Sequence, residues 1–326
     1  MRVLVVGGAG YIGAHMVRML LAEGREVTVF DNLSTGHAWA VPDGLLVRGD
    51  LLERSSVNRL FAEHSFDAVM HFSALSIVPE SVQKPLLYWR NNVGGTLNLL
   101  NAMLEHGVEK FIFSSTAAVF GAPEYTPPNF APMDEAHPCR PITPYGKSKL
   151  AVEQALADLA ASGQMRSIAF RYFNAAGADP GGGIGEAHDP ETHLIPVVLK
   201  ALKAGNATVT VYGDDYDTPD GACVRDYVHV NDLSRAHLLG LDYLANHPGA
   251  HVFNLGSENG FSVLQVIAAI EEVTGLKAPY EIGPRRPGDP PVLVAASGKA
   301  KRELGWRPEF ADLRETIRTA WAWHSA

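Results

Sequence analysis

Short runs of consecutive apolar residues alternate, in the first half of the chain, with longer segments in which apolar residues recur every three or four positions. A strand buried on both faces of a parallel sheet is apolar throughout, so each short run predicts such a strand. The expected strands are 2–6, 26–30, 45–47, 67–71, 110–113 and 166–171. The longer segments predict helices at 12–22, 55–63, 81–106 and 145–161. This alternation indicates an α/β fold with a doubly wound parallel sheet.

The pattern changes after Arg171. Residues 172–190 are rich in Gly, Ala, Asp and Pro, which predicts a loop. Further patterns predict helices and strands that do not form regular strand–helix–strand units; the helices are 193–204, 228–246 and 262–274, and the strands 208–212 and 252–255. We therefore expect a smaller C-terminal α/β domain that binds the substrate. The expected division is 1–180 for the first domain, with 224–258 returning to it, and 181–326 for the second.

A glycine-rich turn joins the first expected strand to the first helix. It carries Gly7, Gly10 and Gly13, and the second strand ends at Asp31. A strand, a glycine loop, a helix, a strand and an acidic residue within about 30 residues form the dinucleotide-binding fingerprint of Rossmann-like folds. The glycines let backbone N–H groups approach a pyrophosphate at the helix N-terminus. Because the Asp31 carboxylate would repel a 2′-phosphate, the pattern favours NAD over NADP.

Composition narrows the class of protein. The chain has 326 residues, of which 46% are hydrophobic and 19% charged, as is ordinary for an α/β enzyme. A net charge of −9 argues against a nucleic-acid partner. The two cysteines, Cys139 and Cys223, make no disulfide framework, so a reducing, cytoplasmic location is expected. The histidines look scattered, and no metal site is expected.

No membrane attachment is expected either. A strand is predicted from residue 2, and no basic segment with an apolar core precedes it, so we expect no signal peptide. No apolar run reaches the roughly 18 residues of a membrane-spanning helix.

Hydroxyl groups and a Tyr–Lys pair supply the candidate chemistry. Ser114, Ser115 and Thr116 follow the buried strand 110–113, at the strand end where open α/β sheets bind ligands. Tyr145 and Lys149 are four residues apart and share one helix face. A neighbouring ammonium group would lower the pKa of the phenol below its usual value of about 10. Such a pair is usually only a solvated helix face, but beside a nucleotide site it suggests an acid–base device.

Eight segments together resemble a known family over essentially the whole chain. They lie at 7–13, 31–37, 80–85, 113–116, 144–149, 171–178, 224–230 and 285–289. The chain resembles the extended short-chain dehydrogenase/reductases and, within them, the UDP-glucose 4-epimerase family. The segments 7–13 and 144–149 mark the superfamily, whereas 224–230 and 285–289 are more specific to nucleotide-sugar epimerases.

The resemblance implies a role for each matching residue. Tyr145 would be the catalytic base, Lys149 its electrostatic partner and a ligand of the nicotinamide ribose, and Thr116 the hydroxyl that shares the sugar O4. NAD would be held by Gly7, Gly10, Tyr11, Ile12, Gly13, Asp31, Asn32, Asp50, Leu51, Phe72, Asn91, Lys149 and Phe173. The UDP-sugar would be held by Thr116, Tyr145, Asn174, His193, Leu194, Tyr212, Arg225, Arg286 and Asp289. Arginines suit a diphosphate because they donate bidentate hydrogen bonds.

The resemblance also implies a reaction and an assembly. NAD would take the C4 hydride while Tyr145 takes the O4 proton, and the 4-keto sugar would turn and be reduced on its other face. UDP-galactose and UDP-glucose would thereby be interconverted, with NAD regenerated. A homodimer built on helices 81–106 and 145–161 is expected.

Alternatives remain open at this point. A 4,6-dehydratase of the same fold would carry an Asp–Glu pair where this chain has Ala117 and Ala118, which disfavours that reaction. A non-catalytic NAD-binding protein would typically lose Tyr145 or Lys149. Another UDP-sugar, such as UDP-xylose, UDP-arabinose or a UDP-N-acetylhexosamine, is compatible with the motifs. Leu293 stands where relatives have Tyr or a small residue, and the loop 122–133 looks longer than usual.

Overall fold

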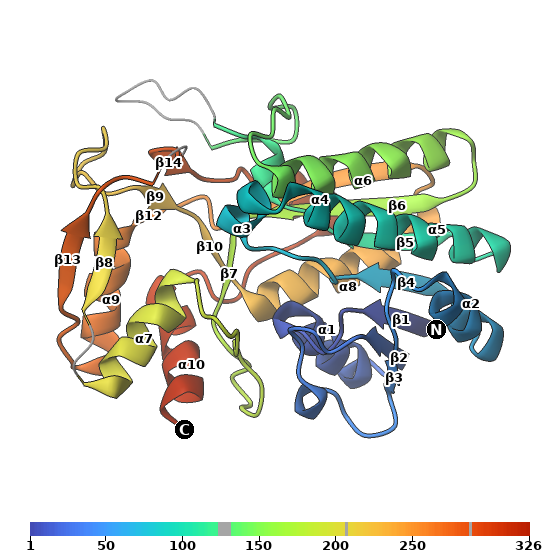
Figure 1. The fold of residues 1–326 in the computed structure, drawn as a ribbon, viewed down its shortest axis with the longest axis horizontal. Coiled ribbons are helices and arrows are strands. Elements are labelled where there is room, and N and C mark those ends of the chain that lie inside the picture. Colours follow the sequence, from blue (N-terminus) through green and yellow to red (C-terminus); the bar gives the residue numbers. More distant parts are fainter. Residues whose placement is uncertain (123–131, 206–207, 287–288) are drawn as a thin grey trace.

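A seven-stranded parallel sheet forms the centre of the larger part of the molecule (Figure 1). The computed structural model describes residues 1–122, 132–205, 208–286 and 289–326. Every neighbouring pair in the sheet is parallel, in the order β11-β6-β5-β4-β1-β2-β3. The strands are β1 (Arg2–Val6), β2 (Glu26–Asp31), β3 (Leu46–Arg48), β4 (Ala68–His71), β5 (Lys110–Ser114), β6 (Arg166–Tyr172) and β11 (Ala250–Leu255). The predicted doubly wound α/β fold is confirmed.

Helices cover both faces of this sheet because alternate strand residues point to opposite sides. On one face, Val3 and Val5 of β1 pack in a cluster with α1 (Tyr11–Ala22) and α8 (Val230–Asn246). On the other, Leu4 and Val6 pack in a cluster with α2 (Arg54–Glu63), α5 (Gly95–Glu105) and α6 (Pro144–Ala161). The sheet is therefore buried on both sides, as its continuous apolar strands predict.

The helix predicted over 81–106 is wrong as a single element. The segment begins earlier, with α3 (Val78–Gln83), and breaks at Lys84, whose φ of −127° and ψ of 60° are not helical. The break arises because a residue that precedes proline is disfavoured in the α conformation, and Pro85 follows. Helix α4 (Pro85–Tyr88), a π-helical stretch (Trp89–Gly94) and α5 then continue the segment.

In the smaller lobe, the described residues form short strands and helices around a separate apolar cluster (Figure 1). The helices are α7 (Leu194–Ala204), α9 (Val263–Thr274) and α10 (Leu313–Ser325). Strand β8 (Val209–Tyr212) pairs with β13 (Tyr280–Gly283), and β9 (Val224–Arg225) lies between β12 (Phe261–Ser262) and β14 (Val292–Leu293). Single-turn or short helical segments occur at Ala38–Ala40, Ala117–Val119 and Ala300–Leu304.

Two strands connect the lobe with the larger part. The predicted loop 172–190 in fact contains β7 (Asn174–Ala176), which pairs in parallel with β10 (Tyr227–His229). Strand β10 occupies the start of the helix predicted over 228–246, so α8 begins only at Val230. Helix α8 and β11 then belong to the large sheet and its cover. The division of the chain into 1–180 and 181–326 stays a prediction.

Two further expectations concern the loop 122–133 and the absence of a membrane-spanning helix. Most of the loop 122–133 lies outside the described residues. Among those described, no helix has both the length and the apolar character that crossing a bilayer requires.

Candidate active site

The glycine loop after β1 is shaped to receive a phosphate group. Gly7 has a φ of +78°, and a Cβ on Gly13 would lie 2.1 Å from the Gly7 carbonyl oxygen, so neither position accommodates a side chain. Helix α1 begins directly after Gly10, which caps it without any side-chain hydrogen bond. A Cβ on Gly10 would meet only the Gly7 oxygen, at 3.4 Å. The first-turn N–H groups of a helix have no acceptor within the helix, so the start of α1 fits the pyrophosphate of a dinucleotide.

Carboxylates at the ends of β2 and β3 line the next part of this edge. The buried Asp31 carboxylate accepts hydrogen bonds from the backbone N–H of Ala9, at 3.0 Å, and of Leu33, at 2.8 Å. The Asn32 side chain donates to Asp50 Oδ2 at 3.1 Å. Asp31 therefore ties β2 to the glycine loop, and its contact with the adenosine ribose stays a prediction. Leu51 follows Asp50 and packs against the core, where its Cβ would lie 3.0 Å from a Cβ on Gly95.

Phe72 and Asn91 approach the same edge from β4 and the π-helical stretch. Phe72 directly follows β4, its N–H donates to the Val6 oxygen at 2.8 Å, and the backbone beside it touches the Gly7 position. Asn91 donates to Asn92 Oδ1 at 3.0 Å, and Asn92 donates to the Ser148 hydroxyl at 3.1 Å. Asn91 is thereby linked to the helix that carries Tyr145.

Helix α6 begins where its first turn can approach the end of β5. The Thr143 hydroxyl caps the helix by accepting from the Gly146 N–H at 3.2 Å. A Cβ on Gly146 would lie 2.5 Å from the Ala118 carbonyl oxygen, so only glycine permits this approach. The close approach brings the Tyr145 phenol to the hydroxyl of Thr116. The structure thus brings the predicted phenol and hydroxyl together, and their chemical roles stay a prediction.

The pKa of Tyr145 differs from the expectation. Burial raises the pKa of the phenol above its usual value, and the hydrogen bond with Thr116 opposes this rise. The Lys149 ammonium points elsewhere: its Nζ donates to the Ser114 carbonyl at 2.8 Å and lies 4.7 Å from the centre of the Phe113 ring. Burial lowers the pKa of Lys149 to about 7, although Glu153 opposes this shift. The expectation that Lys149 lowers the Tyr145 pKa is wrong for this arrangement, because burial of the phenol has the largest effect and the Lys149 ammonium is directed at the Ser114 carbonyl.

A buried ion pair that sequence analysis missed fixes α6 against the sheet. Arg171 Nε lies 3.0 Å from Glu153 Oε1, and its Nη2 lies 2.5 Å from Oε2. The Ser115 hydroxyl donates to the same carboxylate. The two side chains of the pair are only 7% and 6% exposed. Glu153 is one helical turn beyond Lys149, so this pair sets the position of α6. A charged residue inside an apolar strand was the available signal.

The predicted substrate residues form two close pairs in the smaller lobe. Arg225 on β9 makes an ion pair with Asp289. The Arg286 guanidinium lies 4.0 Å from the centre of the Tyr212 ring. Asn174, on β7, donates to the Asp226 carbonyl at 2.8 Å. Two guanidinium groups in one lobe suit a diphosphate.

Leu293 connects this lobe with the segment that follows Thr116. It lies opposite Arg225 in the parallel pairing of β9 and β14. Its side chain packs against an apolar cluster that contains Ala117, Phe120 and Met133, together with Phe173. Because Ala117 follows Thr116, Leu293 lies close to the segment that carries Thr116.

The remaining two predicted substrate residues lie at the start of α7. Leu194 is the first residue of the helix, and His193 is its cap. The sequence suggested that the histidines are scattered, but two of them converge: His188 and His193 meet Glu186 and Glu191 in one group. The occurrence of these four residues within a stretch of eight was the signal for this group. It was missed because the segment has no regular periodicity that predicts which side chains converge.

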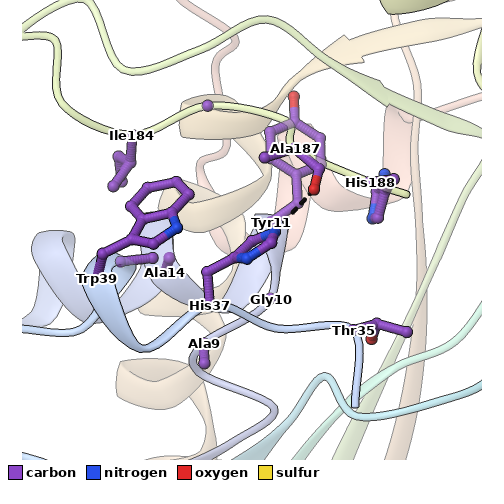
Figure 2. A pocket seen from close by; sticks show the side chains of 12 residues that line it. Ala9, Gly10, Tyr11, Ala14, Thr35, His37, Trp39, Ile184, Ala187 and His188 are labelled. Carbon is purple, nitrogen blue, oxygen red and sulfur yellow. Dashed lines mark hydrogen bonds between the residues drawn. The ribbon is translucent and has the colours of Figure 1, made fainter. Parts of the chain in front are cut away.

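A small pocket lies between the glycine loop and residues 184–188 (Figure 2). Gly10, Tyr11, Trp39 and His188 line it among others. The Tyr11 hydroxyl donates to the Gly177 carbonyl at 2.6 Å. The cofactor side and the 177–193 segment are therefore in direct contact.

Comparison with known proteins places this arrangement in a class. Residues 3–256 match the model of the NAD dependent epimerase/dehydratase family, and the chain belongs to that family. Within it, the chain is similar to UDP-glucose 4-epimerases from Halalkalibacterium halodurans, with 47% identity over 99% of this chain and 96% of the relative, and from Streptococcus mutans, with 48% identity over 100% and 97%. The resemblance found in the sequence and the expected dependence on NAD are confirmed.

Solved structures agree with this assignment. One UDP-glucose 4-epimerase superimposes with a TM-score of 0.95 at 47% identity, covering 100% of this chain and 98% of the other. The enzyme from Brucella ovis in complex with NAD gives 0.93 at 44% identity, with coverage of 98% and 97%. The enzyme from Bifidobacterium longum in complex with NAD+ and UDP gives 0.93 at 39% identity, with coverage of 100% and 98%.

Proposed function

We propose that the protein interconverts UDP-galactose and UDP-glucose by oxidation and reduction at the sugar C4. The observation that carries this proposal is the contact of the Tyr145 phenol with the Thr116 hydroxyl at the carboxyl edge of the sheet, beside the glycine loop. An alcohol carbon held there meets a proton acceptor on one side and a dinucleotide site on the other. When bound, NAD supplies reversible hydride acceptance.

The chain's own residues then have separate tasks. Tyr145 takes the O4 proton and returns it, while Thr116 holds the sugar oxygen against the phenol. Lys149, with its lowered pKa, is poised to hold ribose hydroxyls and to respond to charge nearby. Arg225 and Arg286 hold the diphosphate, so the sugar end is the less firmly held part and can present either face.

The phenol requires a lower pKa for this task than burial alone gives it. A positive charge brought close to Tyr145 would favour the phenolate, since opposite charges stabilise the ionised form. The Lys149 ammonium is the available group of this chain. Its bond to the Ser114 carbonyl would have to be exchanged or shared for that effect.

Two alternatives receive less support. A dehydratase needs an acid and a base after Thr116, where this chain has the apolar Ala117 and Ala118. A wider sugar pocket has one observation in its favour: Leu293 is smaller than tyrosine and borders the catalytic segment. A solved UDP-Glc/GlcNAc 4-epimerase from Campylobacter jejuni shares 40% identity with this chain at a TM-score of 0.86.

A panel of substrates tests the function. The purified protein is incubated, without added cofactor, with UDP-galactose, UDP-glucose, UDP-xylose and UDP-N-acetylglucosamine, and the products are separated. We expect the two hexoses to reach one common equilibrium mixture from either side. Turnover of the pentose with none of either hexose would contradict the proposal.

We further propose a homodimer in the cytoplasm. Helices α3 to α5 expose large apolar side chains in one stretch, among them Val82 at 61%, Leu86 at 80% and Leu97 at 44% exposed. An exposed apolar surface of this kind marks interaction sites. Sedimentation should give a dimer for the parent and a monomer for Leu86→Asp.

The proposed cytoplasmic location rests on the cysteines. The free thiols of Cys139 and Cys223 support a reducing compartment.

A further inference from the structure

Two histidines and two glutamates face one another between β7 and α7. One ligand atom from each of Glu186, His188, Glu191 and His193 lies within 4.8 Å of all the others. The carboxylates are the buried members, with side-chain exposures of 4% for Glu186 and 7% for Glu191. The imidazoles are partly exposed, at 32% and 44%. The group is therefore a half-enclosed concentration of nitrogen and oxygen donors.

The separations within the group are close enough for the four ligand atoms to share one cation. From Glu186 Oε1, the distances are 2.6 Å to His193 Nδ1 and 2.9 Å to His188 Nδ1. From Glu191 Oε1, they are 3.5 Å to His193 Nδ1 and 4.0 Å to His188 Nδ1. Bonds of about 2.0–2.2 Å in a tetrahedral site imply ligand–ligand edges of about 3.3–3.6 Å. The four observed distances lie on both sides of that edge, so small side-chain rotations would place all four atoms around one ion.

One donor in this group lacks a hydrogen bond. The Nδ1 atom of His193 is buried and has no hydrogen-bond partner among the described residues. It nevertheless lies beside Glu186 Oε1, so the distance between the two atoms suits a hydrogen bond but its direction does not. A buried polar nitrogen without a directed bond is costly, and a metal ion on its lone pair would satisfy it.

Surrounding groups hold the carboxylates in place. Glu191 Oε1 accepts from the backbone N–H groups of Thr192, at 2.9 Å, and His193, at 3.0 Å. Lys200 Nζ lies 3.3 Å from Glu191 Oε2 and 3.3 Å from the His188 carbonyl oxygen. Partners of this kind orient the ligands of metal sites.

We propose that Glu186, His188, Glu191 and His193 bind one Zn²⁺ ion as a structural site. Two imidazole nitrogens argue against Ca²⁺ and Mg²⁺, because these ions prefer oxygen ligands. Imidazole together with carboxylate suits zinc. Two carboxylates balance the charge of the ion. Four protein ligands leave no open position, which distinguishes a structural from a catalytic zinc.

The position of the site gives the ion a specific task. His193 caps α7, and both His193 and the Leu194 that follows it are predicted substrate residues. On the other side, the His188 ring lies 6.2 Å from the ring of Tyr11, which belongs to the glycine-loop end of α1. Zinc would fasten the 186–193 segment between these two parts and fix the start of α7.

Metal content tests the site without using activity as the readout. The full-length protein, purified without a histidine tag, is stripped with EDTA, dialysed and titrated with Zn²⁺ against a chromophoric competitor. We expect one ion per chain, and a Co²⁺-substituted sample should show the intense visible bands of tetrahedral cobalt. Absence of stoichiometric Zn²⁺ binding by the parent protein would overturn the proposal and leave the group as an ion-pair cluster.

Matched variants assign the ion to these residues. Loss of partners that only orient ligands costs about 10–100-fold in metal affinity, so loss of a ligand should cost at least that much. We expect this weakening in Glu186→Gln and in His188→Gln, and parent-like affinity in His64→Gln, which changes an exposed histidine at the end of α2. If His188→Gln does not fold, Glu186→Gln provides the same comparison. Equal affinity in the folded ligand variants and the His64 control would place the ion elsewhere and contradict the assignment.

Discussion

In the larger part of the molecule, Tyr145 stands on a helix packed against the central sheet and Thr116 follows a strand of that sheet, whereas in the smaller lobe Arg225 stands on a strand of two residues and Arg286 follows β13. Tyr145 and Thr116 meet because Gly146 permits contact with a fixed backbone. Arg225 and Arg286 instead rest on an ion pair and a ring contact with partly exposed partners. In the function proposed above, this difference would let the sheet fix the reacting groups, whereas the smaller lobe would hold the nucleotide and leave the sugar free to turn.

The largest effect is expected from Gly13→Ala, on the sheet side. The added Cβ would lie 2.1 Å from the Gly7 carbonyl oxygen and 2.8 Å from the Gly8 Cα, so the loop must move. We expect loss of NAD from the purified protein and a fall of about 1–3 kcal/mol or more in the free energy of unfolding. Absorbance of the released nucleotide and urea denaturation measure these effects.

Gly94→Ala is the matched control for that change. A Cβ there meets nothing within 4 Å, and the backbone is already helical. NAD content and stability should stay at the parent level or rise slightly. If both alanine variants retain NAD equally, the loop is less tightly determined than its geometry indicates.

The buried Glu153–Arg171 pair should dominate the stability of the catalytic helix. Glu153→Gln leaves the Arg171 guanidinium buried without its counter-charge, which typically costs about 3–5 kcal/mol. Glu105→Gln breaks the exposed pair with Arg54, whose side chains are 50% and 63% exposed, and should cost under about 1 kcal/mol. Chemical denaturation of both variants compares them directly. Similar losses in the two would show that burial does not separate these pairs.

The stability contribution of Lys149 should depend on pH. Burial lowers the pKa of this lysine in the folded protein from 10.5 to about 7. As the pH falls from 10.5 to 7, the unfolded chain therefore takes up a proton that the folded chain does not, and the folded state loses stability over that window. Between pH 9 and pH 7 the loss is about 2–3 kcal/mol.

Lys149→Met should remove this dependence. Urea midpoints of parent and variant at pH 9 and pH 7 give the comparison, and the variant should gain on the parent at the lower pH. Lys147→Met, at an exposed position of the same helix, serves as the control. If the urea midpoints of the parent and of Lys149→Met change in parallel between the two pH values, burial does not lower the pKa of Lys149 in the folded protein.

The smallest effects are expected in the lobe, at Leu293. A pocket that selects by volume discriminates by only about 1–3 kcal/mol for one or two methylene groups. Leu293→Tyr should reduce any turnover of UDP-N-acetylhexosamines relative to UDP-galactose, and Leu293→Ser should raise it, with little change in stability. The ratio of kcat/KM values measures this. Unchanged ratios in both variants would remove Leu293 from the pocket wall.

How far the sequence could predict these features depends on the range of the interactions. The strands and the glycine loop follow from local patterns, so the sheet and its nucleotide edge could be anticipated. The helix over 81–106 was wrong because the conformational effect of Pro85 on Lys84 outweighed a continuous apolar periodicity.

Contacts between distant segments could not be predicted. The bond from Lys149 to the Ser114 carbonyl depends on how α6 lies on β5, and the pairing of Glu153 with Arg171 depends on β6 being adjacent. The group around Glu186 and His193 lies in a segment without regular structure, where spacing alone does not say which side chains converge.

The fate of the C4 hydrogen tests the proposed reaction most directly. UDP-galactose is incubated with the protein in D2O, and the UDP-glucose product is examined by NMR. We predict product that retains protium at C4, because the hydride is held within the site and returned, and we predict a rate lower by about 10²–10⁴-fold in Tyr145→Phe with NAD still bound. Solvent deuterium at C4, or parent-like turnover in Tyr145→Phe, would contradict the account.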